Sequence, residues 1–318
     1  MTISFKISEK TKDTMNEFYQ DLKREKTPAY ALFQADDGDT VVTLYESGKV
    51  VFQGKDADLS SQFWVETEKI NSGKVDVNNS DDKKKKDKLD KINIIDPKLY
   101  NSNSIGSDEV GTGDYFGPIV VSSAYVTKED ISFLENLGVR DSKKLTDDKI
   151  IEIVPQIIKK IPYSSMILTN LEYNTKYSDS VNMNKIKAIL HNKVLLNLVN
   201  QNYNYDYVVV DEFAKKFVYY NYLKDIPNVC RNITFLTKAE DKVLSVACAS
   251  LISRYIFIKE FNKLSSELGI NLPKGAGPKV DEIGVKIVKE YGFDKLKSIA
   301  KMNFKNTNKI LELLKDET

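Results

Sequence analysis

Apolar residues recur with two different periods along the chain, and the change of period predicts its elements. In residues 10–26, Met15, Phe18, Tyr19 and Leu22 recur every three or four positions, which is the pattern of an amphipathic helix. Short runs rich in β-branched residues follow, separated by the turn sequences DDGD and ESG. This part of the chain is therefore predicted to form three antiparallel strands, at 29–34, 40–45 and 49–53, and a second helix at 56–70.

Later in the sequence, strand-like and helix-like runs alternate. The run Asp206–Asp211 is the most regular, and its β-branched residues predict a central strand that is covered on both faces. The alternation predicts an α/β architecture. The predicted strands are 103–108, 117–126, 163–169, 206–211 and 233–237, and the predicted helices are 146–160, 181–201, 213–222, 241–264 and 280–291.

A polar stretch separates these two patterns. Residues 71–90 are almost without apolar side chains, and 81–90 hold five Lys and four Asp. Such a composition cannot offset the entropy of folding, so we predict a flexible linker, with a basic run that touches phosphate as the alternative. With 318 residues, two domains are expected. We predict an N-terminal α+β domain at 1–72, a charged linker at 73–95 and a second domain at 96–318.

Overall charge indicates no partner, because 47 Lys and Arg face 46 Asp and Glu, a net charge of +1. The distribution along the chain is uneven, however. Residues 1–80 carry 10 basic and 14 acidic side chains, whereas residues 211–310 carry 18 and 11. The C-terminal excess favours a polyanionic partner, although solvated helix surfaces explain it equally well.

A single His and two separated Cys limit which metal sites the chain can form and indicate its redox compartment. They exclude a His-rich metal site and a C-x-x-C motif, and two thiols in a long chain suggest a reducing compartment. There is no apolar segment of signal-peptide length and no run of 18 apolar residues. We therefore expect a cytoplasmic protein without a membrane segment.

Carboxylates stand at the ends of several predicted elements. Asp108 and Glu109 close a strand and lead into the glycine-rich turn GTGDYFGP, and Asp211 closes the most regular strand. Glu240 stands where a long helix begins, so helix capping and dipole effects explain Asp211 and Glu240 as well as a site does. Oxygen ligands without His or Cys favour Mg²⁺ or Mn²⁺, and a pair of such ions supports phosphodiester cleavage.

Six motifs in order resemble bacterial ribonuclease HIII, a member of the type 2 ribonuclease H family. They are DEVGTGDYFGP, RDSKKLT, NKIKAILHN, VVVDEF, TKAED…VACASLISRY and LPKGAG, and they span nearly all of residues 97–310. Each motif is short, but their order and separation are specific. ALFQADDGDTVVTLYESGKVVFQG resembles the TATA-binding-protein-like domain of that family.

The resemblance implies a ribonuclease H-like catalytic domain, with a mixed sheet flanked by helices, after a small TATA-binding-protein-like domain. It implies an endoribonuclease that cleaves the RNA strand of RNA–DNA hybrids and leaves 3′-hydroxyl and 5′-phosphate ends. It also implies that Asp108, Glu109, Asp211 and Glu240 are catalytic and bind two Mg²⁺ or Mn²⁺ ions. The implied substrate contacts are Gly111, Thr112, Gly113, Lys143, Lys144, Ser253 and Arg254.

Some residues depart from related patterns. Thr112 and Glu240 stand where ribonuclease HII usually has Arg and Asp, which favours HIII. Near the C-terminus a segment like His-Phe-Ala-Asn-Thr is expected, and residues 303–307 read Asn-Phe-Lys-Asn-Thr. Asn303 thus takes the place of the His, so no role carries over from that His. His191 is expected to pack in a helix or to form a local hydrogen bond.

Two alternative functions stay open at this point. One is ribonuclease HII-like cleavage at single ribonucleotides embedded in duplex DNA, and the other is a noncatalytic hybrid-binding protein. We expect a monomer whose N-terminal domain adds binding surface for the duplex.

Overall fold

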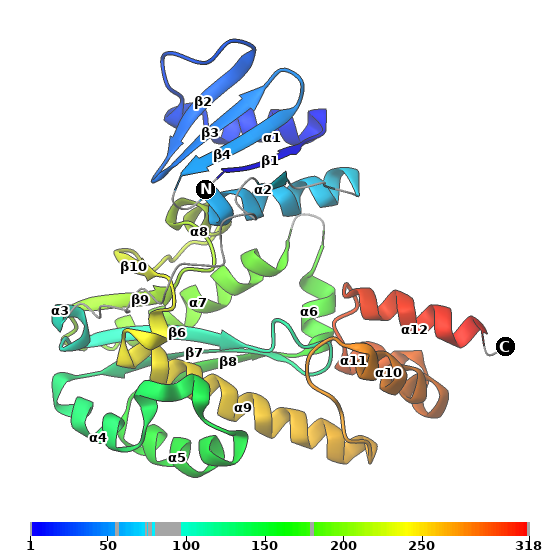
Figure 1. Cartoon of the computed structure of the whole chain (residues 1–318). Coiled ribbons are helices and arrows are strands. Elements are labelled where there is room, and N and C mark those ends of the chain that lie inside the picture. The colour runs from blue at the N-terminus through cyan, green and yellow to red at the C-terminus, as the bar shows by residue number, and fades with distance from the viewer. Residues whose placement is uncertain are drawn as a thin grey trace, which may run out of the picture. The chain divides into compact units, whose positions relative to one another are not determined.

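The structure is a computed structural model, and it describes residues 2–54, 57–73, 75, 78–79, 97–178 and 181–316 (Figure 1). The chain divides into two compact units, one of Met1–Asn93 with Phe213–Lys215 and one of Ile94–Glu212 with Lys216–Thr318. Among the described residues, no helix combines the length and the apolar character needed to cross a membrane.

The first unit is an antiparallel sheet with two helices. Its strand order is β2-β3-β4-β1-β5, and the predicted three-stranded meander is confirmed. The first strand was not predicted, although its burial alternates along the strand as expected for a sheet with one covered face. The elements are β1 (Thr2–Lys6), α1 (Glu9–Phe18), the 3-10 helix η1 (Gln20–Leu22), β2 (Ala31–Asp37), β3 (Thr40–Tyr45), β4 (Lys49–Gly54), α2 (Ala57–Ser72) and β5 (Asn78–Asn79).

Two expectations for this unit need correction. The helix predicted at 10–26 ends at Phe18. It cannot continue to residue 26, because Lys23 forms an antiparallel bridge with Ala35 of β2. Most of the linker predicted at 73–95 lies outside the described residues. Within it, however, β5 pairs with β1, so the sheet extends beyond residue 72.

Alternate side chains of the first sheet face opposite sides. Phe33, Val42 and Phe52 are buried in one core with Met15 and Trp64 from the two helices. The neighbouring positions along each strand therefore face away from these helices. Leu32 is one of them, and 46% of its surface is exposed.

The second unit is built on a mixed five-stranded sheet of order β10-β9-β6-β7-β8. Strands β10, β9 and β6 are parallel, whereas β7 is antiparallel to β6 and β8. All five predicted strands and five predicted helices occur, with ends shifted by a few residues. The strands are β6 (Ser104–Val110), β7 (Ile119–Val126), β8 (Tyr163–Leu168), β9 (Tyr207–Asp211) and β10 (Ile233–Leu236).

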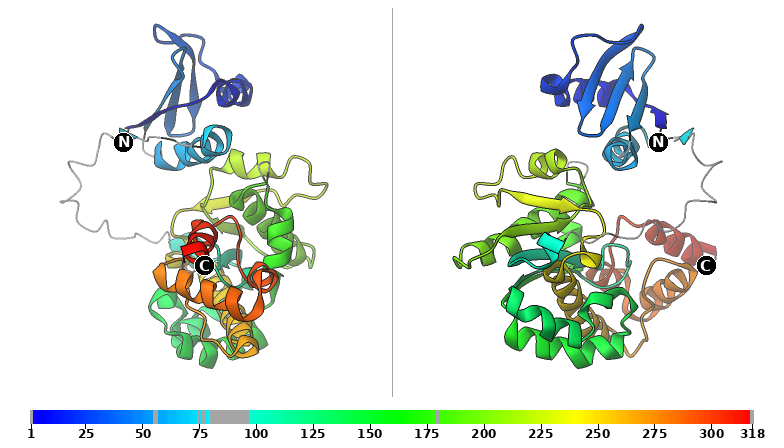
Figure 2. Two further views of the ribbon diagram at one scale, coloured as in Figure 1. Left: turned by 90° about the vertical axis from the view of Figure 1, so that its right-hand side faces the viewer. Right: turned by 60° about the vertical axis from the view of Figure 1, so that its left-hand side comes forward.

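Helices cover both faces of this sheet. The long helix α9 packs on one face with α5 beyond it, and α7 packs on the other (Figures 1 and 2). The unit's helices are α3 (Pro97–Tyr100), η2 (Lys128–Asp130), α4 (Ile131–Asn136), η3 (Val139–Lys144), α5 (Asp147–Lys160), α6 (Asn170–Lys176), α7 (Met183–Val199), α8 (Lys216–Tyr222), η4 (Ala239–Asp241), α9 (Leu244–Leu268), α10 (Pro278–Tyr291), α11 (Phe293–Ile299) and α12 (Lys305–Asp316).

The sheet order corrects the prediction that residues 206–211 form the central strand. Strand β9 is an inner strand but lies second from the edge, and β6 is central. The two strands are parallel neighbours, with Ser107 opposite Val210. The next residue of each strand, Asp108 and Asp211, is therefore placed at the same edge of the sheet.

Candidate active site

The central strand brings two carboxylates to the end of the sheet. Asp108 is 8% exposed, and its Oδ1 accepts a hydrogen bond from the Glu109 N–H at 2.8 Å. Two positions earlier, a Cβ on Gly106 would lie 2.4 Å from the Val246 nitrogen. Because Gly106 has no Cβ, the first turn of α9 approaches β6 closely, and the segment before α9 reaches the strand end.

Asp211 connects its strand to the turn that carries Glu240. Its Oδ1 accepts a hydrogen bond from the Ala239 N–H at 2.8 Å. Ala239 begins η4, and Glu240 is the next residue. Asp211 therefore caps this turn and also lies beside the other acids. A capping role and a role in the site, the two explanations considered from its sequence, are thus compatible.

Two side chains of α7 bind Glu109. Lys187 Nζ lies 2.5 Å from its Oε1, and His191 Nε2 lies 2.9 Å from its Oε2. His191 Nδ1 is 2.8 Å from Ser107 Oγ, which fixes the imidazole from the other side. Four residues separate Lys187 from His191, so both lie on one face of the helix.

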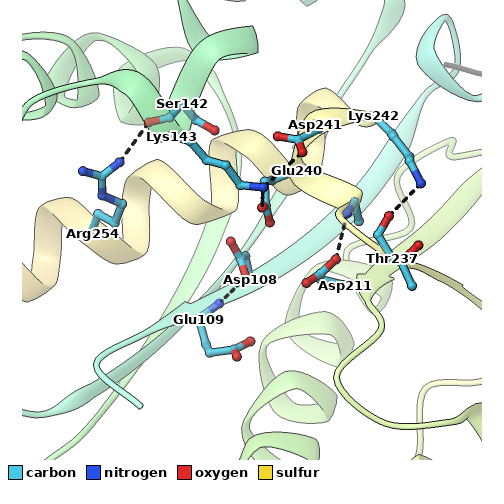
Figure 3. Close-up of polar contacts among 11 residues, drawn as sticks. Asp108, Glu109, Ser142, Lys143, Asp211, Thr237, Glu240, Asp241, Lys242 and Arg254 are labelled. Carbon is cyan, nitrogen blue, oxygen red and sulfur yellow. Dashed lines mark hydrogen bonds and ion pairs between the residues drawn. The ribbon is translucent and has the colours of Figure 1, made fainter. Parts of the chain in front are cut away.

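A second lysine reaches the site from η3. Lys143 Nζ lies 2.5 Å from Glu240 Oε1 and 3.0 Å from Asp241 Oδ2. Figure 3 shows Glu240 between this ammonium and Asp108, with Asp211 and Glu109 beside them. The four predicted acids thus converge on one place, although they come from three separate segments.

Burial and mutual repulsion raise the pKa values of the two aspartates in this group. Burial raises the pKa of Asp108 well above its usual value, and the charges of Glu109 and Glu240 raise it further. Burial also raises the pKa of Asp211, and Glu240 and Glu109 again add to the rise. For both aspartates, burial and the neighbouring carboxylates outweigh the groups that stabilise the charged form, which for Asp211 include Lys187.

Glu109 has the opposite balance. Its burial acts to raise its pKa, but Lys187 and His191 outweigh that effect and lower the pKa to about 2. Glu109 is therefore ionised at neutral pH. The buried Lys187 ammonium supplies the largest part of this stabilisation.

The donor set fits divalent metal ions in type and charge. Carboxylate oxygens are the ligands preferred by Mg²⁺ and Mn²⁺, and several acids offset the repulsion between two ions. In the described part of the chain, no three His, Cys, Asp or Glu side chains are arranged as ligands of one ion. Lys187 and Lys143 instead form ion pairs with Glu109 and Glu240.

The glycine turn after β6 reverses the chain beside the acids. Gly111 has φ +90°, and a Cβ there would lie 2.1 Å from the Pro118 carbonyl oxygen. Nothing lies within 4 Å of the corresponding position on Gly113. At Gly113 the turn therefore presents unobstructed backbone, which suits close contact with a ligand, whereas Gly111 is buried.

Two of the expected substrate contacts, Ser253 and Arg254, bond to the protein's own backbone. Ser253 is fully buried, and its Oγ donates to the Asp108 carbonyl oxygen at 3.1 Å. Arg254 donates to the carbonyl oxygens of Ser142 and Leu145 at 2.9 and 3.1 Å. Both side chains therefore support site segments from behind, whereas Lys143 and Lys144 are exposed.

Asn303, which replaces the expected His, also has a structural contact. Its Oδ1 accepts a hydrogen bond from the Tyr173 hydroxyl at 2.9 Å. Tyr173 lies in α6, so this contact joins α6 to the turn before α12.

Sequence reasoning missed Lys187 and its contact with Glu109. The available signal was the spacing of Lys187 and His191 within the motif NKIKAILHN, which places both on one helix face. For His191, helix packing or a local hydrogen bond was expected, and the structure instead gives it long-range hydrogen-bond contacts with Ser107 and Glu109.

Comparison with known proteins agrees with this geometry. A family model described as Ribonuclease HII matches residues 105–307, and a model described as a domain of unknown function matches residues 2–76. A protein of Staphylococcus aureus (strain JH9) called Ribonuclease HIII is 40% identical over 98% of both chains.

Solved structures show the same likeness. Bst-RNase HIII in complex with Mn²⁺ is 37% identical, covers 99% of this chain and 100% of its own, and superposes with a TM-score of 0.68. The ribonuclease H2 of Pyrococcus horikoshii OT3 is 23% identical, with a TM-score of 0.56 over 67% of this chain and 99% of its own, which is a likeness of fold.

Proposed function

The chain belongs to the ribonuclease HIII family and is a ribonuclease H, and we propose that it cleaves the RNA strand of RNA–DNA hybrids with the four converging carboxylates. The observation that carries this proposal is the placement of Asp108, Glu109, Asp211 and Glu240 at one edge of the sheet (Figure 3). The raised pKa values of Asp108 and Asp211 support it, because both acids have an excess of negative charge around them.

We propose that these acids hold two Mg²⁺ or Mn²⁺ ions. When bound, such a pair activates a water and stabilises the departing 3′-oxygen, which yields 3′-hydroxyl and 5′-phosphate ends. The protein's own contribution is orientation. Asp211 fixes the turn that carries Glu240. The His191 ring is held by Ser107 on one side and contacts the Glu109 carboxylate on the other, which orients that carboxylate.

Recognition of RNA is assigned to the glycine turn. The backbone of Gly111, Thr112 and Gly113 lies next to the strand that bears Asp108, in a position to contact the sugar next to the scissile phosphate. Because the 2′-hydroxyl distinguishes RNA from DNA, a backbone contact there selects the strand that is cut. Lys143 and Lys144 are proposed to contact phosphates.

The choice of substrate separates ribonuclease HIII from HII activity. We expect faster cleavage of a continuous RNA–DNA hybrid than of duplex DNA that holds one ribonucleotide, measured on labelled strands at equal concentration. The reverse preference would indicate HII-like function. Hybrid binding without cleavage, with Mg²⁺ or Mn²⁺ present, would indicate the noncatalytic alternative.

We expect Lys143→Ala to weaken hybrid binding and to reduce its dependence on salt. Loss of one phosphate contact lowers the slope of log affinity against log salt by about 1. Binding measured by fluorescence anisotropy at several salt concentrations checks this. Lys149→Ala, which removes an exposed lysine of α5 with a partner in its own helix, is the matched control. An unchanged slope for Lys143→Ala would contradict the phosphate contact.

The open face of the N-terminal sheet is proposed to bind the duplex. Leu32 and Val51 lie on this face, so Leu32→Glu and Val51→Glu together should weaken hybrid binding at least several-fold by placing acids against phosphate. The same assay in the full chain measures it. Thr14→Glu, on the exposed surface of α1, adds an acid elsewhere in the unit. Equal effects of the two kinds of substitution would contradict a specific binding face.

We also propose a cytoplasmic location for the protein. Cys230 and Cys248 are both buried free thiols, as expected for a cytoplasmic protein. We also propose that the chain acts as a monomer.

A further inference from the structure

A lysine lies completely buried behind the glycine turn. Lys301 follows α11 and is 0% exposed, which is rare for a lysine unless its charge is satisfied. Its Nζ donates to the carbonyl oxygens of Asp114 and Gly117 at 2.7 and 2.6 Å. Its hydrogen-bond acceptors are thus two carbonyls of the segment that continues the turn towards β7.

The backbone around Lys301 pairs with the same segment. The Lys301 N–H donates to the Tyr115 carbonyl oxygen at 2.9 Å, and the Gly117 N–H donates to that of Ile299 at 3.0 Å. Phe116 and Ala300 form the bridge between these bonds. The side chain of Lys301 therefore adds two further bonds to a short antiparallel pairing.

The loop before α10 holds the turn from another side. The Tyr115 N–H donates to the Gly275 carbonyl oxygen at 2.9 Å, and the Gly275 N–H donates to Asp114 Oδ1 at 2.6 Å. Residues 114–117 are thus bonded to two segments. Gly113, immediately before them, is exposed and free to meet a ligand.

Burial of this ammonium is unfavourable in itself. Burial lowers the pKa of Lys301 to about 7, against the opposing charge of Asp114. An apolar side chain of similar length would avoid this cost. It could not bond two carbonyls three residues apart, which the ammonium draws towards one point. The presence of a buried lysine is therefore explained by the two carbonyls that its amino group holds together.

We propose that Lys301 is a positioning residue for the RNA strand: it fixes residues 114–117, and through them the backbone of Gly111, Thr112 and Gly113 that contacts the ribose. This inference rests on the proposed function. It assigns to a side chain outside the active site a share in the preference for RNA over DNA.

Lys301→Met in the full chain tests this inference. We expect a roughly tenfold rise in the Kd for the hybrid, a much smaller change for duplex DNA, and a larger change in KM than in kcat. Binding is measured in EDTA, where the hybrid stays intact. Hydrogen exchange should become faster at the amides of residues 111–117.

Three further variants separate positioning from general loss of stability. Lys301→Gln keeps a hydrogen-bond donor and should give intermediate effects, and it decides the question if the Met variant does not fold. Ile157→Ala removes buried volume in α5, in a different core cluster, and lowers stability without touching the turn. Lys297→Met removes an exposed lysine four residues away.

The inference is overturned if both Lys301 variants bind and cleave like the wild type. It is also overturned if Ile157→Ala, compared at an equal loss of melting temperature, produces the same loss of hybrid preference. If the wild type itself neither prefers nor cleaves the hybrid, the proposed function fails instead, so the two failures are distinguishable.

Discussion

Asp108→Asn should abolish cleavage of the hybrid while leaving the fold intact or slightly more stable. Asn keeps the size of the side chain but removes the charge, and loss of a central catalytic group lowers kcat by about 10³-fold or more. Because burial, Glu109 and Glu240 raise the pKa of Asp108, its charged form is costly in the folded protein at neutral pH. Neutral Asn removes that cost.

Two assays check this prediction together. Single-turnover cleavage in Mn²⁺ measures activity, and thermal unfolding in EDTA measures stability. Asp148→Asn makes the same change at an exposed position of α5 and should leave both unaltered. An active Asp108→Asn variant would remove this acid from the mechanism, and an unfolded one would leave its structural role as the explanation for lost activity.

Lys187→Met should destabilise the metal-free protein more than any exposed lysine substitution. Removing one partner of a buried ion pair costs about 3–5 kcal/mol when the remaining charge has no other partner. Here His191 still contacts Glu109 at 2.9 Å, so we expect a loss at the lower end of this range. The side chains of Lys187 and Glu109 are only 11% and 13% exposed, so solvent screens them little. Chemical unfolding in EDTA measures the free energy, with Lys193→Met, exposed on the same helix, as control.

The difference between wild type and Lys187→Met should shrink in acid. In the wild type the pKa of Glu109 is lowered to about 2, so its stabilising contribution is full above its usual pKa and is lost as pH falls towards 2. Without Lys187 the pKa of Glu109 is higher, so falling pH removes its less compensated charge earlier than in the wild type. A difference that stays constant between pH 7 and pH 3 would contradict the ion pair.

The fold was largely predictable because its signals are local. The strand at Asp206–Asp211 is recognisable from its β-branched residues alone, but its rank in the sheet is not, since pairing with β6 depends on residues a hundred positions away. β1 and α12 were missed for a different reason. Each lies near a chain end, and β1 has only five residues, so its alternation is too short to count.

The site was predictable as a set of acids but not as a set of contacts. Motif order singled out the four carboxylates that the structure brings together. It could not show that Lys187 faces Glu109 from α7, because that contact joins segments 78 residues apart in the sequence. For Ser253 and Arg254 as well, the sequence could not show which groups their side chains contact. Their motif lies beside the site, and only the orientation of α9 turns them towards backbone carbonyls.

The most direct test of the account is cleavage of a continuous RNA–DNA hybrid by the wild-type protein in EDTA, Mg²⁺ and Mn²⁺, with analysis of the product ends. We predict cuts in the RNA strand only, with 3′-hydroxyl and 5′-phosphate ends, in Mg²⁺ or Mn²⁺ and none in EDTA. Equal cleavage in EDTA, or no cleavage with either ion, would contradict the metal-dependent mechanism at Asp108, Glu109, Asp211 and Glu240.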